Sequence, residues 1–146
     1  MSRMPVTSVS DVVRVPLNQH LVSQGMLTVI QAGEHLPFKV DRCFIVTASG
    51  PDTIGGNHAH RLLTQFLICL AGQVEVLVDD STRSEMHTLQ DPSCGLLVPP
   101  GIWCRQTYRI PDSILLVLCD KPFAESDYIR DYDAFTAHVA QRRHRE

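Results

Sequence analysis

The sequence predicts an all-β domain that ends in one short α-helix, and three observations predict it. Up to about residue 120, short runs rich in Val, Ile and Leu alternate with clusters of Gly, Pro, Asp and Ser. Beyond Pro122 the apolar residues recur at helical spacing instead. The 146 residues suffice for one core and are too few for two ordinary domains. Regularly spaced short strands are typical of a β-sandwich or barrel, so we expect a single domain over residues 1–146.

The strands are predicted from apolar runs that have turn residues at their ends. The predicted strands are Leu27–Gln31, Arg42–Thr47, Gln65–Leu70, Val74–Asp79, Gly95–Val98, Trp103–Ile110 and Ser113–Cys119. Leu115–Leu118 is apolar at every position, which predicts a central strand covered on both faces. Together these segments predict a barrel over about residues 22–120.

The C-terminal helix is predicted from four apolar residues. Ile129, Tyr132, Phe135 and Val139 recur at helical spacing. Ser126 or Asp127 can cap the start of such a helix, because their side-chain oxygens accept bonds from free backbone N–H groups. We therefore expect one helix over about residues 125–142.

The composition excludes several classes of partner. An apolar fraction of 44% and a charged fraction of 20% are typical of a globular protein. A formal net charge of −3 gives no reason to expect a nucleic-acid partner. No apolar run approaches the ~20 residues of a membrane span. Met1–Val9 lacks the basic-then-apolar layout of a signal peptide. We expect no membrane association.

The cysteines predict a reducing compartment. The chain contains Cys43, Cys69, Cys94, Cys104 and Cys119. Their number is odd, they form no Cys-x-x-Cys pair, and most lie in or beside apolar runs. Such residues are typical of reduced, mostly buried thiols, and we expect a cytoplasmic protein.

The main candidate for a functional site is His58-Ala59-His60. Two histidines at i and i+2 on a strand point to the same face, so both imidazoles reach one cavity. There they can ligate a metal, or one can act as a general base. Gln65 and Gly72 follow this pair, and a second motif spans Pro99–Cys104.

These residues resemble the two signature motifs of the cupin superfamily: His-x-His followed by an acidic residue and a glycine, then Pro-x-Gly-x-x-His. The resemblance implies a double-stranded β-helix, or jelly-roll, barrel with His58, His60, Gln65 and Cys104 around one cavity. Two of the four metal-ligand positions differ, because Gln65 replaces a glutamate and Cys104 replaces the last histidine.

A longer resemblance is to the cupin-fold sugar-nucleotide 3,4-ketoisomerases. It is carried by Gly56–Arg61, Gln65–Gly72, Gly95–Trp103 and the tail Glu125–Phe135, and it runs from about residue 22 to 135. The family isomerises dTDP-4-keto-6-deoxyglucose to a 3-keto-6-deoxyhexose in deoxysugar biosynthesis. It forms dimers and uses no metal or cofactor. The resemblance implies a nucleotide-sugar substrate and a homodimer, and short apolar N-terminal strands could be exchanged between its subunits.

The chain departs from this family at several positions. Gln24 and Gly55 stand where arginine is usual, and Phe44 lies near the position of a usual tyrosine. Cys104 stands where histidine or arginine is usual. Loss of several polar groups fits an altered substrate, an altered product stereochemistry or lost activity.

The surviving residues suit the chemistry that the resemblance implies. Moving a ketone from C4 to C3 requires a base that removes the C3 proton, and histidine titrates near neutral pH. By resemblance His60 is the base, and His58 orients the substrate or stabilises charge. Arg42 and Gln65 can donate to the enolate oxygen.

Trp103 and Cys104 are further candidates for substrate contact, although each has an alternative interpretation. Trp103 could pack in the core or at a dimer interface, and Cys104 could be a small apolar filler. Strand alternation adds a constraint. If Cys104 faces inward, Gln106 and Tyr108 do too, and Trp103 points away unless a bulge intervenes.

Three function classes remain, in this order. The first is the metal-free isomerase of a nucleotide-linked 4-keto-6-deoxyhexose. The second is a metal-dependent, oxygenase-like cupin that uses His58, His60 and Cys104, because mixed nitrogen and sulfur ligation suits iron, copper or zinc. The third is an inactive cupin that only binds a sugar nucleotide.

Overall fold

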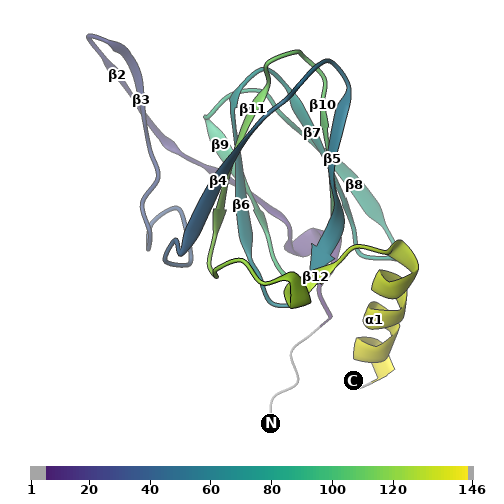
Figure 1. Cartoon of the computed structure of the whole chain (residues 1–146). Helices are drawn as coiled ribbons and strands as arrows, with labels where there is room; N and C mark the ends of the chain where they lie inside the picture. Colours follow the sequence, from purple (N-terminus) through teal and green to yellow (C-terminus); the bar gives the residue numbers. More distant parts are fainter. Residues whose placement is uncertain (1–5, 145–146) are drawn as a thin grey trace.

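The protein folds into two facing antiparallel β-sheets, in a computed structural model that describes residues 6–144 (Figure 1). One five-stranded sheet contains, in spatial order, β1 (Val13–Pro16), β9 (Cys94–Val98), β6 (Gln65–Ala71), β11 (Ile114–Cys119) and β4 (Arg42–Thr47). The other contains β12 (Tyr128–Ile129), β5 (Thr53–His60), β10 (Trp103–Tyr108), β7 (Val74–Asp79) and β8 (Ser84–Leu89). The predicted all-β jelly-roll barrel with a C-terminal helix is confirmed.

The remaining elements flank this barrel. A hairpin of β2 (Asn18–Val22) and β3 (Gly25–Val29) extends away from it (Figure 1). The other elements are the 3-10 turns η1 (Val9–Asp11) and η2 (Glu125–Asp127) and the helix α1 (Tyr132–His144).

The main core lies between the two sheets and follows strand alternation. Val74, Val76 and Val78 of β7 point inward and are fully buried. β11 lies between β6 and β4, as its apolar sequence predicts. Its residues Leu115 and Val117 face the main core, whereas Leu116 and Leu118 join a second apolar cluster. Both faces of β11 are therefore covered.

The second cluster covers the outer face of the β6 sheet. Phe66 and Ile68 are fully buried there beneath Leu36, which follows the hairpin in the chain. A Cβ atom at Gly95 of the neighbouring β9 would overlap the Phe66 ring. The absence of a side chain at Gly95 therefore leaves room for this ring.

The helix begins later than the sequence predicts. The expected cap at Ser126 or Asp127 is wrong, because α1 begins at Tyr132 and the Asp131 carboxylate accepts the Ala134 N–H at 2.9 Å. Residues 125–129 instead form η2 and β12, and β12 adds an edge strand to β5. The Asp127 carboxylate, which matches a cap pattern in the sequence, is therefore available for another interaction.

Several strands were missed because their sequences are too polar or too short. β8 is a largely exposed edge strand that pairs with β7. The intervening turn is held by Asp80, whose Oδ1 accepts the Thr82 and Arg83 N–H groups. β1 pairs with β9, so the barrel begins at Val13 rather than near residue 22. Across residues 6–144, none of the helices has the length and apolar character that crossing a membrane demands.

Candidate active site

Two histidines and a tyrosine form a ring cluster at one end of the barrel. His58 and His60 lie near the end of β5, and their ring centroids are 4.9 Å apart. Tyr128 of β12 pairs directly with His60 across the strands. Its ring centroid lies 4.4 Å from that of His60 and 4.9 Å from that of His58. The prediction that both imidazoles share one strand face is confirmed.

The Asp127 carboxylate fixes the tautomer of His60. Nδ1 of His60 lies 2.9 Å from Oδ2 of Asp127, and a carboxylate can only accept. Nδ1 therefore carries the hydrogen, and Nε2 keeps its lone pair. Nε2 is buried and has no hydrogen-bond partner within residues 6–144. A buried nitrogen lone pair without a partner is suited to accepting a proton from a bound molecule.

Burial and Asp127 act in opposite directions on His60. Burial lowers the pKa of His60 below its ordinary 6.5, while the hydrogen bond and charge of Asp127 raise it. The net shift is downward, so the imidazole is neutral at pH 7. The carboxylate keeps the imidazole more basic than burial alone would leave it.

His58 is held in the same tautomer by the backbone. Its Nδ1 lies 3.1 Å from the carbonyl oxygen of Gly56, which can only accept, so Nε2 again carries the lone pair. Burial and the neighbouring His60 lower the pKa of His58 to about 4. His58 is therefore neutral at physiological pH. Its Nε2 can accept a hydrogen bond from a hydroxyl group.

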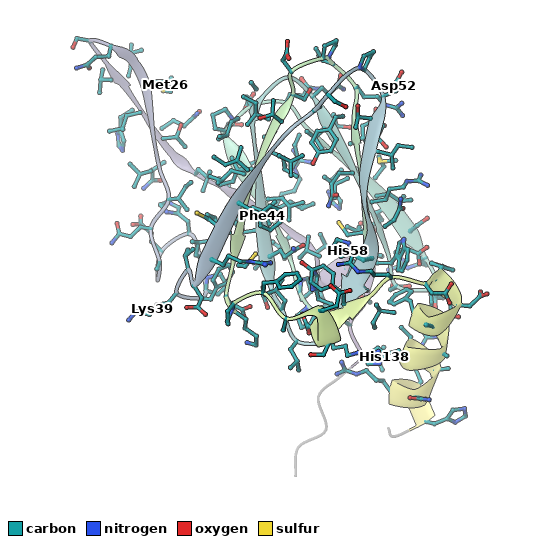
Figure 2. All side chains as sticks on the ribbon, viewed as in Figure 1. Met26, Lys39, Phe44, Asp52, His58 and His138 are labelled. Carbon is teal, nitrogen blue, oxygen red and sulfur yellow. The ribbon has the colours of Figure 1, made fainter. Side chains whose placement is uncertain are left out.

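A cavity of about 120 Å³ opens beside His58 inside the barrel. It is lined by Phe44, Val46, Gly55, Gly56, His58, Gln65, Gln106, Tyr108, Leu115 and Val117. Figure 2 shows Phe44 and His58 on facing walls of the barrel. Gly56 has a φ of +79°, and a Cβ there would overlap the Gln106 amide. Glycine at this position therefore keeps the wall beside His58 in place.

Arg42 lies at the start of β4, near the ring cluster. Its guanidinium carbon is 5.3 Å from the Phe44 ring centroid and 5.4 Å from that of Phe123. Burial lowers the pKa of Arg42, and the nearby Tyr128 side chain contributes to raising it above its usual value. A permanent cation is thus held next to the ring cluster, as the prediction of a substrate contact at Arg42 requires.

The other predicted site residues lie in different surroundings. Gln65 is buried and lines the cavity. Cys104 pairs with His58 across the strands, but its thiol is buried in the main core. Burial raises the pKa of Cys104 to about 12, so it is a neutral thiol. This environment fits the apolar-filler interpretation.

Trp103 lies outside the cavity. Its ring packs against Tyr132 at 5.3 Å and Phe135 at 5.7 Å, between the barrel and α1. Strand alternation predicts this placement, because Cys104 and Gln106 of the same strand point inward. The structure gives Trp103 a packing role, and the predicted substrate contact at Trp103 finds no support.

Several residues of the site were not found by sequence reasoning. Asp127 was predicted only as a possible helix cap, and Tyr128 was not among the predicted site residues. Arg130 lies 4.2 Å above the Tyr128 ring centroid, and Glu125 binds its guanidinium at 2.7 and 3.0 Å. The signal that could have found them is the tail Glu125–Phe135, which carried the family resemblance.

The chain is similar to known sugar-nucleotide isomerases over most of its length. The family model described as FdtA, WxcM-like, C-terminal matches residues 10–140. The TDP-4-oxo-6-deoxy-alpha-D-glucose-3,4-oxoisomerase of Aneurinibacillus thermoaerophilus is 34% identical over 119 residues, which are 82% of this chain and 86% of that protein.

Solved structures agree with this similarity. The 3,4-ketoisomerase QdtA of Thermoanaerobacterium thermosaccharolyticum is 30% identical with a TM-score of 0.87, over 92% of this chain and 98% of that one. The 3,4-ketoisomerase of Helicobacter canadensis is 28% identical with a TM-score of 0.85, over 89% and 98% of the two chains. The family match spans nearly the whole barrel and helix, and this chain therefore belongs to the FdtA, WxcM-like family that the sequence resemblance predicted.

Proposed function

We propose that this protein is a 3,4-ketoisomerase that acts on a TDP-linked 4-keto-6-deoxyhexose in deoxysugar biosynthesis. One observation carries the proposal: Nε2 of His60 is a buried lone pair that has no partner among residues 6–144, and Asp127 fixes the tautomer that exposes it. The relatives support the choice of substrate, since QdtA has been solved with TDP-4-keto-6-deoxyglucose and with TDP.

The proposed reaction is a balanced proton transfer that needs no cofactor. Nε2 of His60 accepts the proton on C3, which the neighbouring C4 carbonyl makes acidic. The electrons of the broken C–H bond form an enediolate between C3 and C4. A proton then returns to carbon at C4, while the hydroxyl proton passes from the C3 oxygen to the C4 oxygen. The ketone has moved to C3, and no atom is gained or lost.

The developing negative charge on oxygen has donors close by. The Tyr128 ring lies beside the two histidines, and its side chain interacts with Arg42. Such preorganised donors stabilise an enolate without reorganising during the reaction. Neutral His58 can accept a hydrogen bond from a sugar hydroxyl through Nε2. Gln65 supplies an amide at the cavity wall.

The test is direct. The protein is incubated with TDP-4-keto-6-deoxyglucose in D₂O, and NMR follows the C3 proton and the position of the carbonyl. We expect loss of the C3 proton signal and formation of a 3-keto product. A protein that binds the nucleotide sugar but neither exchanges this proton nor moves the ketone would be the inactive binding module instead.

We expect activity without a metal. Of the conventional ligand positions, Gln65 is neutral and Cys104 remains protonated, so only the two imidazoles are strong ligands. No group of three or more His, Cys, Asp or Glu side chains suited to a metal ion occurs between residues 6 and 144. Elemental analysis should find no stoichiometric iron, copper or zinc, and a chelator should leave turnover unchanged. Stoichiometric metal together with chelator-sensitive activity would favour the metal-dependent cupin.

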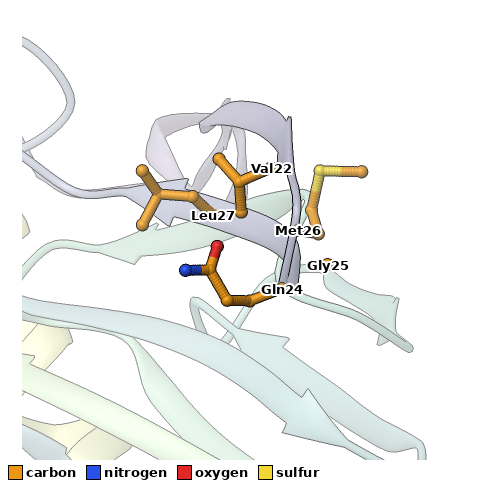
Figure 3. Close-up of a pocket in the computed structure, with 5 residues that line it drawn as sticks. All are labelled: Val22, Gln24, Gly25, Met26 and Leu27. Carbon is orange, nitrogen blue, oxygen red and sulfur yellow. The ribbon is translucent and has the colours of Figure 1, made fainter.

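The proposal includes a homodimer in which the β2–β3 hairpin is exchanged. Among the described strands, β2 and β3 pair only with each other. Leu21 of this hairpin is 84% exposed, and Met26 and Leu27 near its tip are exposed too (Figure 3). Ile45, on the outward side of the edge strand β4, is also exposed. Docking on a second copy would remove these apolar side chains from water.

Light scattering tests the dimer. At micromolar concentration we expect a mass twice the 16.3 kDa of one chain. Leu27→Asp would place a charge in the proposed interface and should lower the mass toward that of the monomer. Ala137→Asp, on the exposed side of α1, is the control and should stay dimeric. A parent protein of monomer mass would contradict the exchange.

The proposal also places the protein in the cytoplasm as a single domain of residues 1–146. All five cysteines are free thiols. The described residues form one barrel with its helix. Both observations support these two assignments.

A further inference from the structure

Arg42 is a cation without an acidic partner in the described part of the chain. Two other arginines bind carboxylates, Arg109 at 2.9 Å and Arg130 at 2.7 Å. Arg42 forms no ion pair between residues 6 and 144, and its Nε is buried there without a hydrogen-bond partner. Its Nη2 lies 3.8 Å from Sγ of Cys119, which is a weak acceptor. The charge of Arg42 is therefore not neutralised by any carboxylate of residues 6–144.

Two aromatic rings contact this guanidinium instead. Its carbon atom lies 5.3 Å from the ring centroid of Phe44 and 5.4 Å from that of Phe123. Both distances are within the ~6 Å at which a ring face attracts a cation. Phe44 belongs to β4, like Arg42 itself, whereas Phe123 belongs to the segment between β11 and η2. The two rings therefore hold the guanidinium from separate parts of the chain.

Contact with aromatic rings leaves more of an arginine available than contact with a carboxylate does. A carboxylate accepts the N–H groups of the guanidinium and cancels its charge. A phenyl ring attracts the cation through its π face and has no lone pair to occupy those N–H groups. The rings of Phe44 and Phe123 thus fix Arg42 in place, while its charge and its N–H donors stay available to an oxygen of a bound molecule.

Phe123 lies outside the core. Its side chain is 57% exposed, and it belongs to none of the three buried apolar clusters of residues 6–144. Its ring packs on that of Tyr128, with 5.6 Å between the centroids, and Tyr128 in turn contacts both histidines. This exposed aromatic side chain is therefore placed where it can act on the site rather than on the stability of the core.

We infer that Phe123 is a positioning residue, which with Phe44 holds the Arg42 guanidinium beside Tyr128 so that its N–H groups can donate to the enolate oxygen of the substrate. The inference rests on the proposed function and adds to it a residue outside both cupin motifs. A guanidinium that is held before the reaction needs no reorganisation when negative charge develops. Without the ring of Phe123, a long and flexible side chain has to be ordered in each turnover.

Phe123→Leu tests the ring, because leucine keeps an apolar side chain at this exposed position but has no π face. We expect kcat with TDP-4-keto-6-deoxyglucose to fall by roughly 3- to 30-fold, the range of a cation–π contact from exposed to desolvated sites. KM should change less, since the contact matters most when charge develops on the oxygen. Phe123→Tyr keeps the ring and should retain the kcat of the parent. Ile110→Ala, at another exposed apolar residue, is the control and should match the parent.

A double-mutant comparison shows whether Phe123 acts through Arg42. Exchange of the C3 proton is measured in Arg42→Gln with and without Phe123→Leu. If the ring works only by holding the guanidinium, Phe123→Leu should cause no further loss once Arg42 is gone. A side chain that supported the fold alone would lower exchange by the same factor in both backgrounds.

NMR of the substrate-free protein measures the contact itself. The Nε–H resonance of Arg42 is assigned by its loss in Arg42→Gln. Ring currents should displace this resonance in the parent and in Phe123→Tyr, and Phe123→Leu should move it toward the position of an exposed arginine.

The outcomes separate this inference from the proposed function. An unchanged kcat in Phe123→Leu, an equal loss in Phe123→Tyr, or independent effects of the Phe123 and Arg42 changes would overturn the positioning role and leave the ketoisomerase intact. A parent that neither exchanges the C3 proton nor moves the ketone would overturn the proposed function. The resonance then still decides whether Phe123 holds Arg42, and an identical Nε–H shift in the parent and in Phe123→Leu would contradict that contact too.

Discussion

His60→Asn should lower turnover by roughly 10²–10⁴-fold, the usual contribution of a general base, while the nucleotide sugar still binds. Asparagine keeps approximate size and can hydrogen-bond to Asp127, but it offers no basic nitrogen where Nε2 of His60 lies. Because the lost interaction acts only when the C3 proton moves, kcat should fall far more than KM rises. Exchange of the C3 proton of the bound 4-keto sugar, followed by NMR, measures the effect directly.

Two other histidine variants make this result specific. His58→Asn should retain more C3 exchange than His60→Asn, since His58 is assigned to orientation. His87→Asn changes a histidine of the edge strand β8, away from the ring cluster, and should behave like the parent. If His58→Asn stopped exchange and His60→Asn did not, the two roles would be reversed. If neither variant affected exchange, the base would lie outside the pair.

Asp127→Asn should lower turnover by a similar factor, because it changes the tautomer of His60 rather than removing the imidazole. The amide can donate a hydrogen to Nδ1 of His60, which would move the ring hydrogen to Nε2 and remove the lone pair that faces the site. In a serine protease, the corresponding carboxylate-to-amide change lowers turnover by about 10⁴-fold for this reason. The amide oxygen can still accept the Leu62 N–H, so the local fold should persist.

The pH profile identifies this positioning role. His60 works as the neutral base, so activity is present above its pKa and is lost as the pH falls through it. Burial lowers that pKa below 6.5 and Asp127 raises it. The acid limb of the parent's kcat/KM profile should therefore lie below pH 6.5, and in Asp127→Asn it should shift to still lower pH. Asp127→Glu should restore part of the activity. Asp133→Asn, on α1, is the control and should change neither the turnover rate nor the position of the acid limb. An unchanged limb in Asp127→Asn would show that the carboxylate serves structure alone.

The barrel could be predicted because the sequences of its strands show the alternation or the apolar runs that are typical of buried strands. β7 alternates buried and partly buried residues, and β11 is apolar throughout, so pattern alone indicates which faces are covered. The same alternation placed His58 and His60 on one face. It also placed Gln106 and Tyr108 of β10 inside the barrel and Trp103 outside.

The partners of the histidines could not be predicted in this way. Asp127 lies 67 positions after His60, and the two meet only because β12 adds itself to the edge of β5. A strand of two residues has too few side chains to show a period, and an acidic residue before an amphipathic helix matches a cap equally well. The hairpin β2–β3 was anticipated only in part, because within the described chain its two strands pair only with each other.

Asp127 also joins the C-terminal segment to three consecutive residues at the end of β5. Besides the His60 ring, its Oδ1 accepts the Leu62 N–H at 2.6 Å, and its carbonyl oxygen accepts the Arg61 N–H at 2.9 Å. These two amide hydrogens are consequently shielded only while the tail is docked. Their exchange with deuterated solvent reports the fraction of molecules whose base is correctly oriented, without any substrate present. During synthesis the same link forms only after residue 127 has emerged from the ribosome, so a nascent chain that already carries both histidines is still an incomplete catalyst.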